Sequence, residues 1–133
     1  MIYLPDTNAC SHFMRGHPAV VEKWIEAAPQ IRLCALVVAE LEYGASKSRS
    51  PRQQQRVTQL ASRLPFEPFA REDTLTYAKL RSHLERKGEI IGPLDLLIAA
   101  QALRLGATVV THNIAEFKRV PKLKVVDWQT SSA

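Results

Sequence analysis

This 133-residue sequence lacks the features of a disulfide-linked, zinc-binding or membrane-spanning protein. Its two cysteines form no Cys-x-x-Cys pair, and no cluster of cysteine and histidine suggests a zinc site. No apolar run is long enough to cross a bilayer, and no basic stretch followed by an apolar signal region opens the chain. We therefore expect a cytoplasmic protein without membrane attachment, in which Cys10 and Cys34 are reduced and act as small apolar residues.

Several catalytic motifs are missing as well. The sequence contains no Gly-x-x-x-x-Gly-Lys loop for nucleotide phosphates and no Gly-x-Ser-x-Gly turn that would present a catalytic serine. The histidines have neither metal-ligand spacing nor a nucleophile partner, so we expect surface or loop positions for His12, His17, His83 and His112. Trp24 and Trp128 are interpreted as packing residues.

The chain carries a moderate excess of positive charge. Its formal net charge is +5 and its isoelectric point is near 9.5, which favours an acidic partner such as nucleic acid or an acidic protein. The basic residues gather in two groups, one at Lys47, Arg49, Arg52 and Arg56, and the other at Lys118, Arg119, Lys122 and Lys124. Each group is equally compatible with an ordinary solvated face.

Length and hydrophobic patterning predict one α/β domain over residues 1–133, with a frayed tail at 130–133. Short apolar strands are expected at 2–4, 31–34, 66–69, 108–111 and 123–126. Helices are expected at 18–28, 36–48, from 50 onward, 72–87 and 93–105, and the helix at 36–48 is expected to be buried on most sides. Strands that alternate with helices indicate a mostly parallel sheet, which binds ligands at the carboxyl ends of its strands.

Three acidic residues stand in apolar surroundings. Asp6 ends the first strand, Glu40 lies within an apolar helical segment, and Asp95 lies in the first turn of another. An unpaired buried carboxylate is costly, and three together repel one another unless a cation lies between them. All-oxygen ligands favour Mg²⁺ or Mn²⁺, so the sequence suggests a divalent-metal site at one edge of the sheet.

Each carboxylate also has an ordinary explanation. Asp6 can cap a helix that follows the first strand, Asp95 is favoured by the dipole of its own helix, and Glu40 can pair with a lysine. Their joint occurrence, together with Asn113 after the strand at 108–111, is what favours a site.

Four segments, in this order, resemble PIN-domain ribonucleases, and most closely the VapC toxins of type II toxin–antitoxin modules. They are Asp6-Thr-Asn, Val38-Ala-Glu-Leu-Glu-Tyr-Gly-Ala, Gly92-Pro-Leu-Asp-Leu-Leu-Ile-Ala-Ala, and Val109-Val-Thr-His-Asn-Ile-Ala-Glu-Phe followed by Val126-Asp-Trp. The resemblance implies a three-layer α/β/α domain. It also implies a Mg²⁺- or Mn²⁺-dependent endoribonuclease toxin that cuts structured RNA, namely initiator tRNA in the anticodon loop. A VapB-type antitoxin would block this site, and the toxin would form a homodimer.

The resemblance also assigns roles to residues. Asp6, Glu40 and Asp95 would surround the metal, with the Thr7 hydroxyl in support. The family's fourth acidic position falls on Asn113, which brings an oxygen without a charge, and Glu116 can reach the site through a water molecule. Basic side chains would hold the RNA backbone next to the cut, and the candidates are Arg49, Arg52 and Lys118.

Two other functions stay open at this point. One is a nucleic-acid-binding α/β module without catalysis, in which Asp6 and Asp95 act only as helix caps. The other is a metal-dependent hydrolase of small phosphoesters, which shares the acidic site but needs no basic flank.

Overall fold

The computed structural model describes residues 1–130, in which short strands alternate with helices. In chain order the elements are β1 (Tyr3–Pro5), α1 (Thr7–Met14), α2 (Pro18–Ala27), the 3₁₀ turn η1 (Ala28–Gln30), β2 (Leu33–Cys34), α3 (Ala35–Ser48), α4 (Pro51–Arg63), β3 (Phe66–Glu67), α5 (Arg71–Lys87), α6 (Pro93–Leu105), β4 (Thr108–Val110), α7 (Ile114–Phe117) and β5 (Lys124–Val126).

All strand pairs in the described residues are parallel. β1 pairs with β4, β4 pairs with β5, and β2 pairs with β3. A bridge between Tyr3 and Ile31 places β2 beside β1, so the strands follow the order β3-β2-β1-β4-β5. The strand order reverses between β1 and β4, and in such sheets the ligand crevice lies at the carboxyl ends of the strands at that point.

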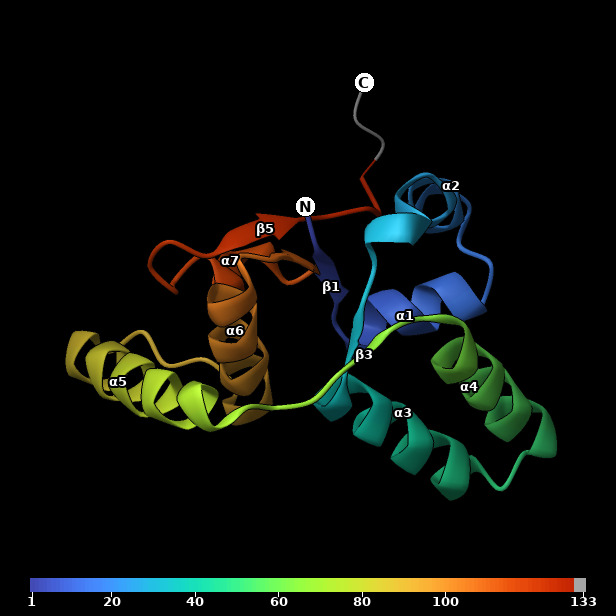
Figure 1. The fold of residues 1–133 in the computed structure, drawn as a ribbon, viewed down its shortest axis with the longest axis horizontal. Helices are drawn as coiled ribbons and strands as arrows, with labels where there is room; N and C mark the ends of the chain where they lie inside the picture. Colours follow the sequence, from blue (N-terminus) through green and yellow to red (C-terminus); the bar gives the residue numbers. More distant parts are fainter. Residues whose placement is uncertain (131–133) are drawn as a thin grey trace.

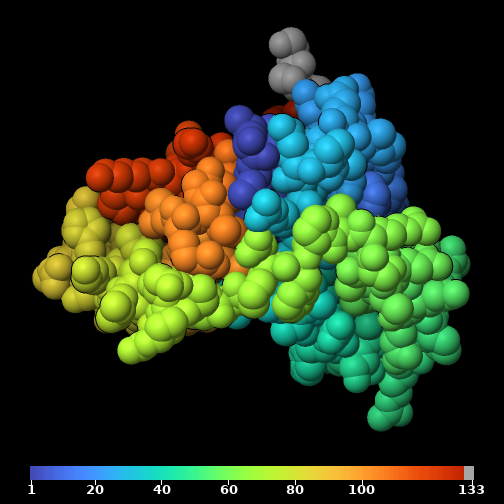
Figure 2. Space-filling model, viewed as in Figure 1, coloured from blue at the N-terminus to red at the C-terminus, as the bar shows by residue number. Residues whose placement is uncertain are grey.

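The helices cover both sides of this sheet. Figure 1 shows α5 and α6 on one side of the strands and α1 and α2 on the other, with the α3–α4 pair extending away from the sheet. Figure 2 shows the segment between α4 and α5 crossing this face of the molecule. The three-layer α/β/α prediction is therefore confirmed. Fully buried side chains from strands and helices meet in the core, among them Leu4, Val37, Ile98, Val109 and Phe117.

The predicted elements are confirmed with small shifts at their ends. The largest shift follows α2, where Pro29 lies inside a 3₁₀ turn and the chain continues to Ile31 before β2 begins. Cys10 and Cys34 are buried free thiols, and Trp24 and Trp128 are buried, as expected. None of the helices in residues 1–130 has the length and apolar character needed to cross a membrane.

One expectation about the burial of a helix is wrong. Helix α3 is buried along one face only, through Val37, Val38, Leu41 and Ala45, because α1 and α4 cover that face and leave the other in solvent. The expected frayed tail begins at Thr130, whose hydroxyl donates to the Asp127 carbonyl at 3.1 Å, and its remainder lies outside the described residues.

Candidate active site

Asp6 lies at the carboxyl end of β1, in the crevice where the strand order reverses. Its backbone N–H donates to the Val110 carbonyl at 2.9 Å, which continues the β1–β4 pairing by one residue. Its carboxylate oxygen Oδ1 accepts from the Ala9 N–H at 2.9 Å, so Asp6 does cap α1. The side chain is only 6% exposed, and burial raises its pKa, against hydrogen bonds from Thr111 and Ala9 that lower it. The negative charge of Glu40 raises this pKa further.

Asp95 lies in the first turn of α6 and is half-buried. Burial raises its pKa to about 6, and the negative charges of Asp6, Glu116 and Glu40 add to that increase. Every neighbouring charge that shifts this group is therefore negative. A carboxylate that only served the α6 dipole would not need three acidic neighbours, so capping alone does not explain the position.

Glu40 is placed differently from what the sequence suggested. It is exposed on the solvent face of α3, because the apolar residues around it in the sequence point to the opposite face. Its Oε1 accepts a hydrogen bond from the Thr7 hydroxyl, so Thr7 contacts one of the predicted carboxylates. The charge of Glu40 still raises the pKa of both Asp6 and Asp95, so it belongs to the same electrostatic cluster.

A fourth carboxylate joins the cluster at position 116. Asn113 caps the short helix α7, and its side-chain amide donates to Glu116 Oε2. Glu116 in turn raises the pKa of Asp95. The fourth negative charge is therefore supplied by Glu116, while Asn113 holds that carboxylate in place.

Within residues 1–130, no three acidic, histidine or cysteine side chains converge closely enough to enclose a cation as they stand. The two outer carboxylates are held by hydrogen bonds from Thr7 and Asn113. The donor set nevertheless fits Mg²⁺ or Mn²⁺ by its chemistry, because it consists of carboxylate oxygens whose charges raise the pKa of Asp6 and Asp95.

The three candidate RNA-binding residues divide into two places. Arg49 ends α3 in the left-handed conformation and Arg52 lies in the first turn of α4, so both stand at the far end of the α3–α4 pair. Glu40 is nine residues before Arg49, which corresponds to roughly 13 Å along a helix axis. Lys118 follows α7 directly and lies two residues after Glu116. Only Lys118 is next to the acidic cluster in the chain.

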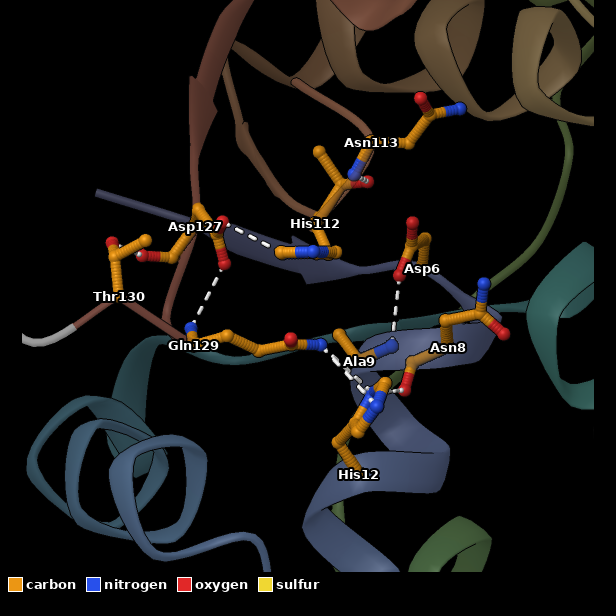
Figure 3. A network of polar contacts seen from close by, with 10 residues as sticks. Asp6, Asn8, Ala9, His12, His112, Asn113, Asp127, Gln129 and Thr130 are labelled. Atoms are coloured by element: carbon orange, nitrogen blue, oxygen red, sulfur yellow. Dashed lines mark hydrogen bonds and ion pairs between the residues drawn. The ribbon is translucent and has the colours of Figure 1, made fainter. Parts of the chain in front are cut away.

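A polar network beside Asp6 was not foreseen from the sequence. Figure 3 shows it connecting the loop after β4, the start of α1 and the segment after β5. His112 Nδ1 lies 2.9 Å from Asp127 Oδ2, and the side-chain amide of Gln129 lies 3.1 Å from His12 Nδ1. His12 Nδ1 also lies 2.6 Å from the Asn8 carbonyl oxygen. The loop position expected for His112 is confirmed, but no sequence spacing relates it to Asp127.

Comparison with known proteins places the chain in a family. The family model for the PIN domain matches residues 3–123. Ribonuclease VapC2 of Rickettsia felis is 42% identical over 132 residues, which cover 96% of this chain and 98% of that protein. The tRNA(fMet)-specific endonuclease VapC of Salmonella typhimurium is 31% identical over 128 residues, which cover 95% of this chain and 97% of that protein.

Solved structures agree with this placement. The VapBC2 complex from Rickettsia felis, bound to a DNA fragment from its promoter, contains a chain with a TM-score of 0.89 and 41% identity, covering 96% of this chain and 99% of that one. DNA-bound VapBC from Salmonella typhimurium gives a TM-score of 0.90 at 32% identity, covering 96% and 98%. Together with the carboxylates at the β1–β4 crevice, these matches show that the chain belongs to the PIN-domain family, as a member of its VapC group.

Proposed function

We propose that this protein is a Mg²⁺- or Mn²⁺-dependent endoribonuclease toxin of a VapBC-type module. The observation that carries the proposal is the cluster of Asp6, Glu40, Asp95 and Glu116 at the carboxyl ends of β1 and β4. Burial, together with the negative charges of Asp6, Glu116 and Glu40, raises the pKa of Asp95 to about 6, and no basic side chain is among the charges that act on it. Such a cluster is stable in its charged form only with a cation among its oxygens.

We assign different roles to the carboxylates according to their positions. Asp6 is buried and Asp95 is half-buried, and the pKa of both is raised, so we assign them as the main metal ligands. Glu40 has one oxygen engaged by Thr7 and is assigned to bind through water or to orient the attacking water. The bound metal would lower the pKa of a water molecule and polarise a phosphodiester oxygen. Without a cation, the same carboxylates repel a phosphate from the site.

The proposed substrate is structured RNA, and specifically initiator tRNA cut in its anticodon loop. The Salmonella relative at 31% identity is named as a tRNA(fMet)-specific endonuclease, and the Rickettsia relative at 42% identity is named as a ribonuclease. The net charge of +5 favours a polyanion, and Lys118, two residues after Glu116 in the chain, is our candidate for holding backbone phosphates on one side of the cut.

The proposed protein partner is a VapB-type antitoxin. The similar chains of known structure come from VapBC complexes. A groove of about 440 Å³ between α2 and α4 has an apolar lining that includes Phe13, Trp24 and Leu60, and it also contains Arg56 and Arg63. An amphipathic antitoxin helix with acidic flanks would fit this groove. A basic side chain from the same antitoxin would neutralise the carboxylates much as the metal does. A homodimer is part of the same proposal.

The test uses the purified chain without antitoxin. We expect cleavage of initiator tRNA in the anticodon loop, loss of cleavage with chelator, and recovery with Mg²⁺ or Mn²⁺ but not efficiently with Ca²⁺. An elongator methionine tRNA serves as the control for substrate choice, and a chromogenic phosphoester tests for general phosphohydrolase activity. Cleavage that survives exhaustive chelation would rule out the metal mechanism, and turnover of the phosphoester alone would favour a small-molecule hydrolase.

A further inference from the structure

The proposed metal chemistry leaves the choice of RNA over DNA unexplained. When water attacks a phosphodiester, the 2′-hydroxyl of the sugar is neither nucleophile nor leaving group, so the carboxylates and the metal act alike on both nucleic acids. A nuclease that prefers RNA must therefore contact the 2′-hydroxyl through a protein group near the cut. This inference rests on the proposed ribonuclease function and concerns which group makes that contact.

The pair formed by His112 and Asp127 has the geometry for such a contact. Asp127 Oδ2 lies 2.9 Å from His112 Nδ1, and because an ionised carboxylate only accepts hydrogen bonds, Nδ1 carries the proton. In the neutral ring, Nε2 then presents a lone pair. The His112 side chain is 62% exposed, whereas that of Asp127 is only 13% exposed. The acceptor nitrogen thus belongs to a ring that faces solvent, while its carboxylate partner is sheltered.

Both members of the pair are held in place by the backbone around them. The Thr111 N–H donates to the Val126 carbonyl at 2.9 Å, which fixes the β4 loop against the end of β5. Asp127 Oδ1 accepts from the Gln129 N–H at 2.9 Å, so the carboxylate cannot turn away from the imidazole without losing that bond. A ring held in this way loses little conformational freedom when it binds a ligand.

The pair also lies between the acidic cluster and a groove. His112 follows Thr111, which hydrogen-bonds Asp6, and precedes Asn113, which holds Glu116. On the other side, Asp127 lines a groove of about 740 Å³ together with Ile114, Lys118 and Thr130. A groove of this volume is within the usual range for ligand sites. His112 stands on the exposed loop between Thr111 and Ile114, and Ile114 lines this groove.

We propose that His112, held by Asp127, accepts a hydrogen bond from the 2′-hydroxyl of a nucleotide next to the scissile phosphate and thereby selects RNA over DNA. His112 is then a specificity residue that touches the substrate, and Asp127 is a positioning residue that fixes the tautomer of the ring. The alternative is that the pair has a structural role only and joins the β4 loop to the segment after β5.

The test pairs a protein change with a substrate change. The probes are anticodon stem-loop RNAs of initiator tRNA, each with a single 2′-deoxy sugar within two nucleotides of the cut. For the wild type we expect one of these to lower kcat/KM by about three- to tenfold, the effect of one hydrogen bond. His112→Ala should lower kcat/KM on the all-ribose RNA by a similar factor, and its kcat/KM should not change further with that deoxy sugar. The loss of kcat/KM that the deoxy sugar causes in Asp127→Asn should lie between the losses in the wild type and in His112→Ala.

His83→Ala is the matched control, because His83 lies on α5, outside the polar network drawn in Figure 3. With the deoxy sugar, its kcat/KM should fall by the same factor as that of the wild type; this factor is the deoxy penalty. If His112→Ala retains that penalty, or if the wild type shows none near the cut, the proposal is overturned. Binding of the same RNAs to Asp6→Asn, with and without His112→Ala, gives the comparison without cleavage. Because that comparison needs no cleavage, a wild type that cuts no RNA would contradict the proposed function without deciding the role of His112.

Discussion

Two buried aspartates in this molecule have opposite surroundings. Asp73, on α5, is 0% exposed and receives two hydrogen bonds from Arg104 on α6, at 2.7 Å to Oδ1 and 3.2 Å to Oδ2. The Ala70 N–H adds a third at 2.8 Å. Asp6 is 6% exposed and is hydrogen-bonded only by neutral donors. Of the charges that act on it, Glu40 raises its pKa and His12 lowers it, the effect of Glu40 being the larger.

The comparison separates a structural carboxylate from a functional one. The Asp73–Arg104 pair is complete within the chain, because a bidentate guanidinium neutralises the acid and joins α5 to α6. No guanidinium or ammonium group acts in this way on Asp6 or Asp95, and His12 is the one basic side chain that lowers the pKa of Asp6. This deficit of positive charge is what a cation, or a basic side chain of an antitoxin, would fill. Burial of an acid is therefore a weaker guide to function than the sign of the charges around it.

The largest expected effect concerns catalysis. Asp6→Asn and Asp95→Asn should each lower RNA cleavage at least about a hundredfold, which corresponds to ~2.7 kcal/mol in the barrier. The fold should persist, because an asparagine at position 6 still accepts the Ala9 N–H and is an equally good helix cap. Single-turnover cleavage and thermal unfolding measure the two effects. Glu42→Gln, two residues from Glu40 on the same helix, is the control and should cleave normally. Wild-type rates in either aspartate variant would remove that residue from the site.

The next effect concerns stability, and it should appear at the Asp73–Arg104 pair and not in the acidic cluster. Arg104→Met leaves Asp73 buried without its cation, so we expect a loss of about 3–5 kcal/mol in the free energy of unfolding. Asp73→Asn should cost less, because the Arg104 side chain is 28% exposed and can turn to water. Urea denaturation of both variants gives the difference. A smaller loss of stability for Arg104→Met than for Asp73→Asn would contradict this account. It would also be contradicted if either variant folded normally but cleaved RNA more slowly.

A smaller effect should appear in the dependence of stability on pH. The pKa of Asp95 is raised from 3.8 to about 6 in the folded chain, so its ionised form destabilises the fold. Asp95→Asn should therefore raise the midpoint temperature above the wild-type value at pH 8, by a few degrees. The gap should narrow as the pH falls through 6 and vanish below about pH 4, where the wild-type carboxyl is protonated in both states. Metal-free protein must be used, and a constant gap across this range would show that charge is not its cause.

The sequence predicts that Asp6 and Asp95 lie in at least partly buried surroundings, as the structure shows, because both interrupt apolar segments that a sheet and a helix must bury. The exposure of Glu40 was missed because the apolar residues beside it in the chain lie on the other face of α3. The His112–Asp127 pair was missed for a different reason. Its members are 15 residues apart, and they meet only because β4 and β5 pair in one particular register. Local patterns predict elements and their ends, whereas contacts between strands depend on a register that the sequence alone leaves open.

The smallest expected effects concern Asn113 and Glu116, at the rim of the acidic cluster. Its amide donates to Glu116 Oε2, so Asn113→Asp would set two carboxylates against each other. We expect this variant to be less stable than the wild type in the metal-free state. It should also bind Mn²⁺ more tightly, by a few-fold, because a further negative charge is added beside Glu116, which already acts on Asp95.

Glu116→Gln isolates the other partner of that hydrogen bond. It removes one of the charges that raise the pKa of Asp95, so metal affinity and cleavage should fall, but less than in Asp6→Asn, because Glu116 lies at the rim and Asp6 is buried. Calorimetric Mn²⁺ titration of the wild type, Asn113→Asp and Glu116→Gln, with cleavage rates alongside, decides the matter. If Asn113→Asp leaves the affinity unchanged and Glu116→Gln is silent in both assays, the metal is held by Asp6, Glu40 and Asp95 alone. The charge of Glu116 would then affect the titration of Asp95 without contributing to binding or catalysis.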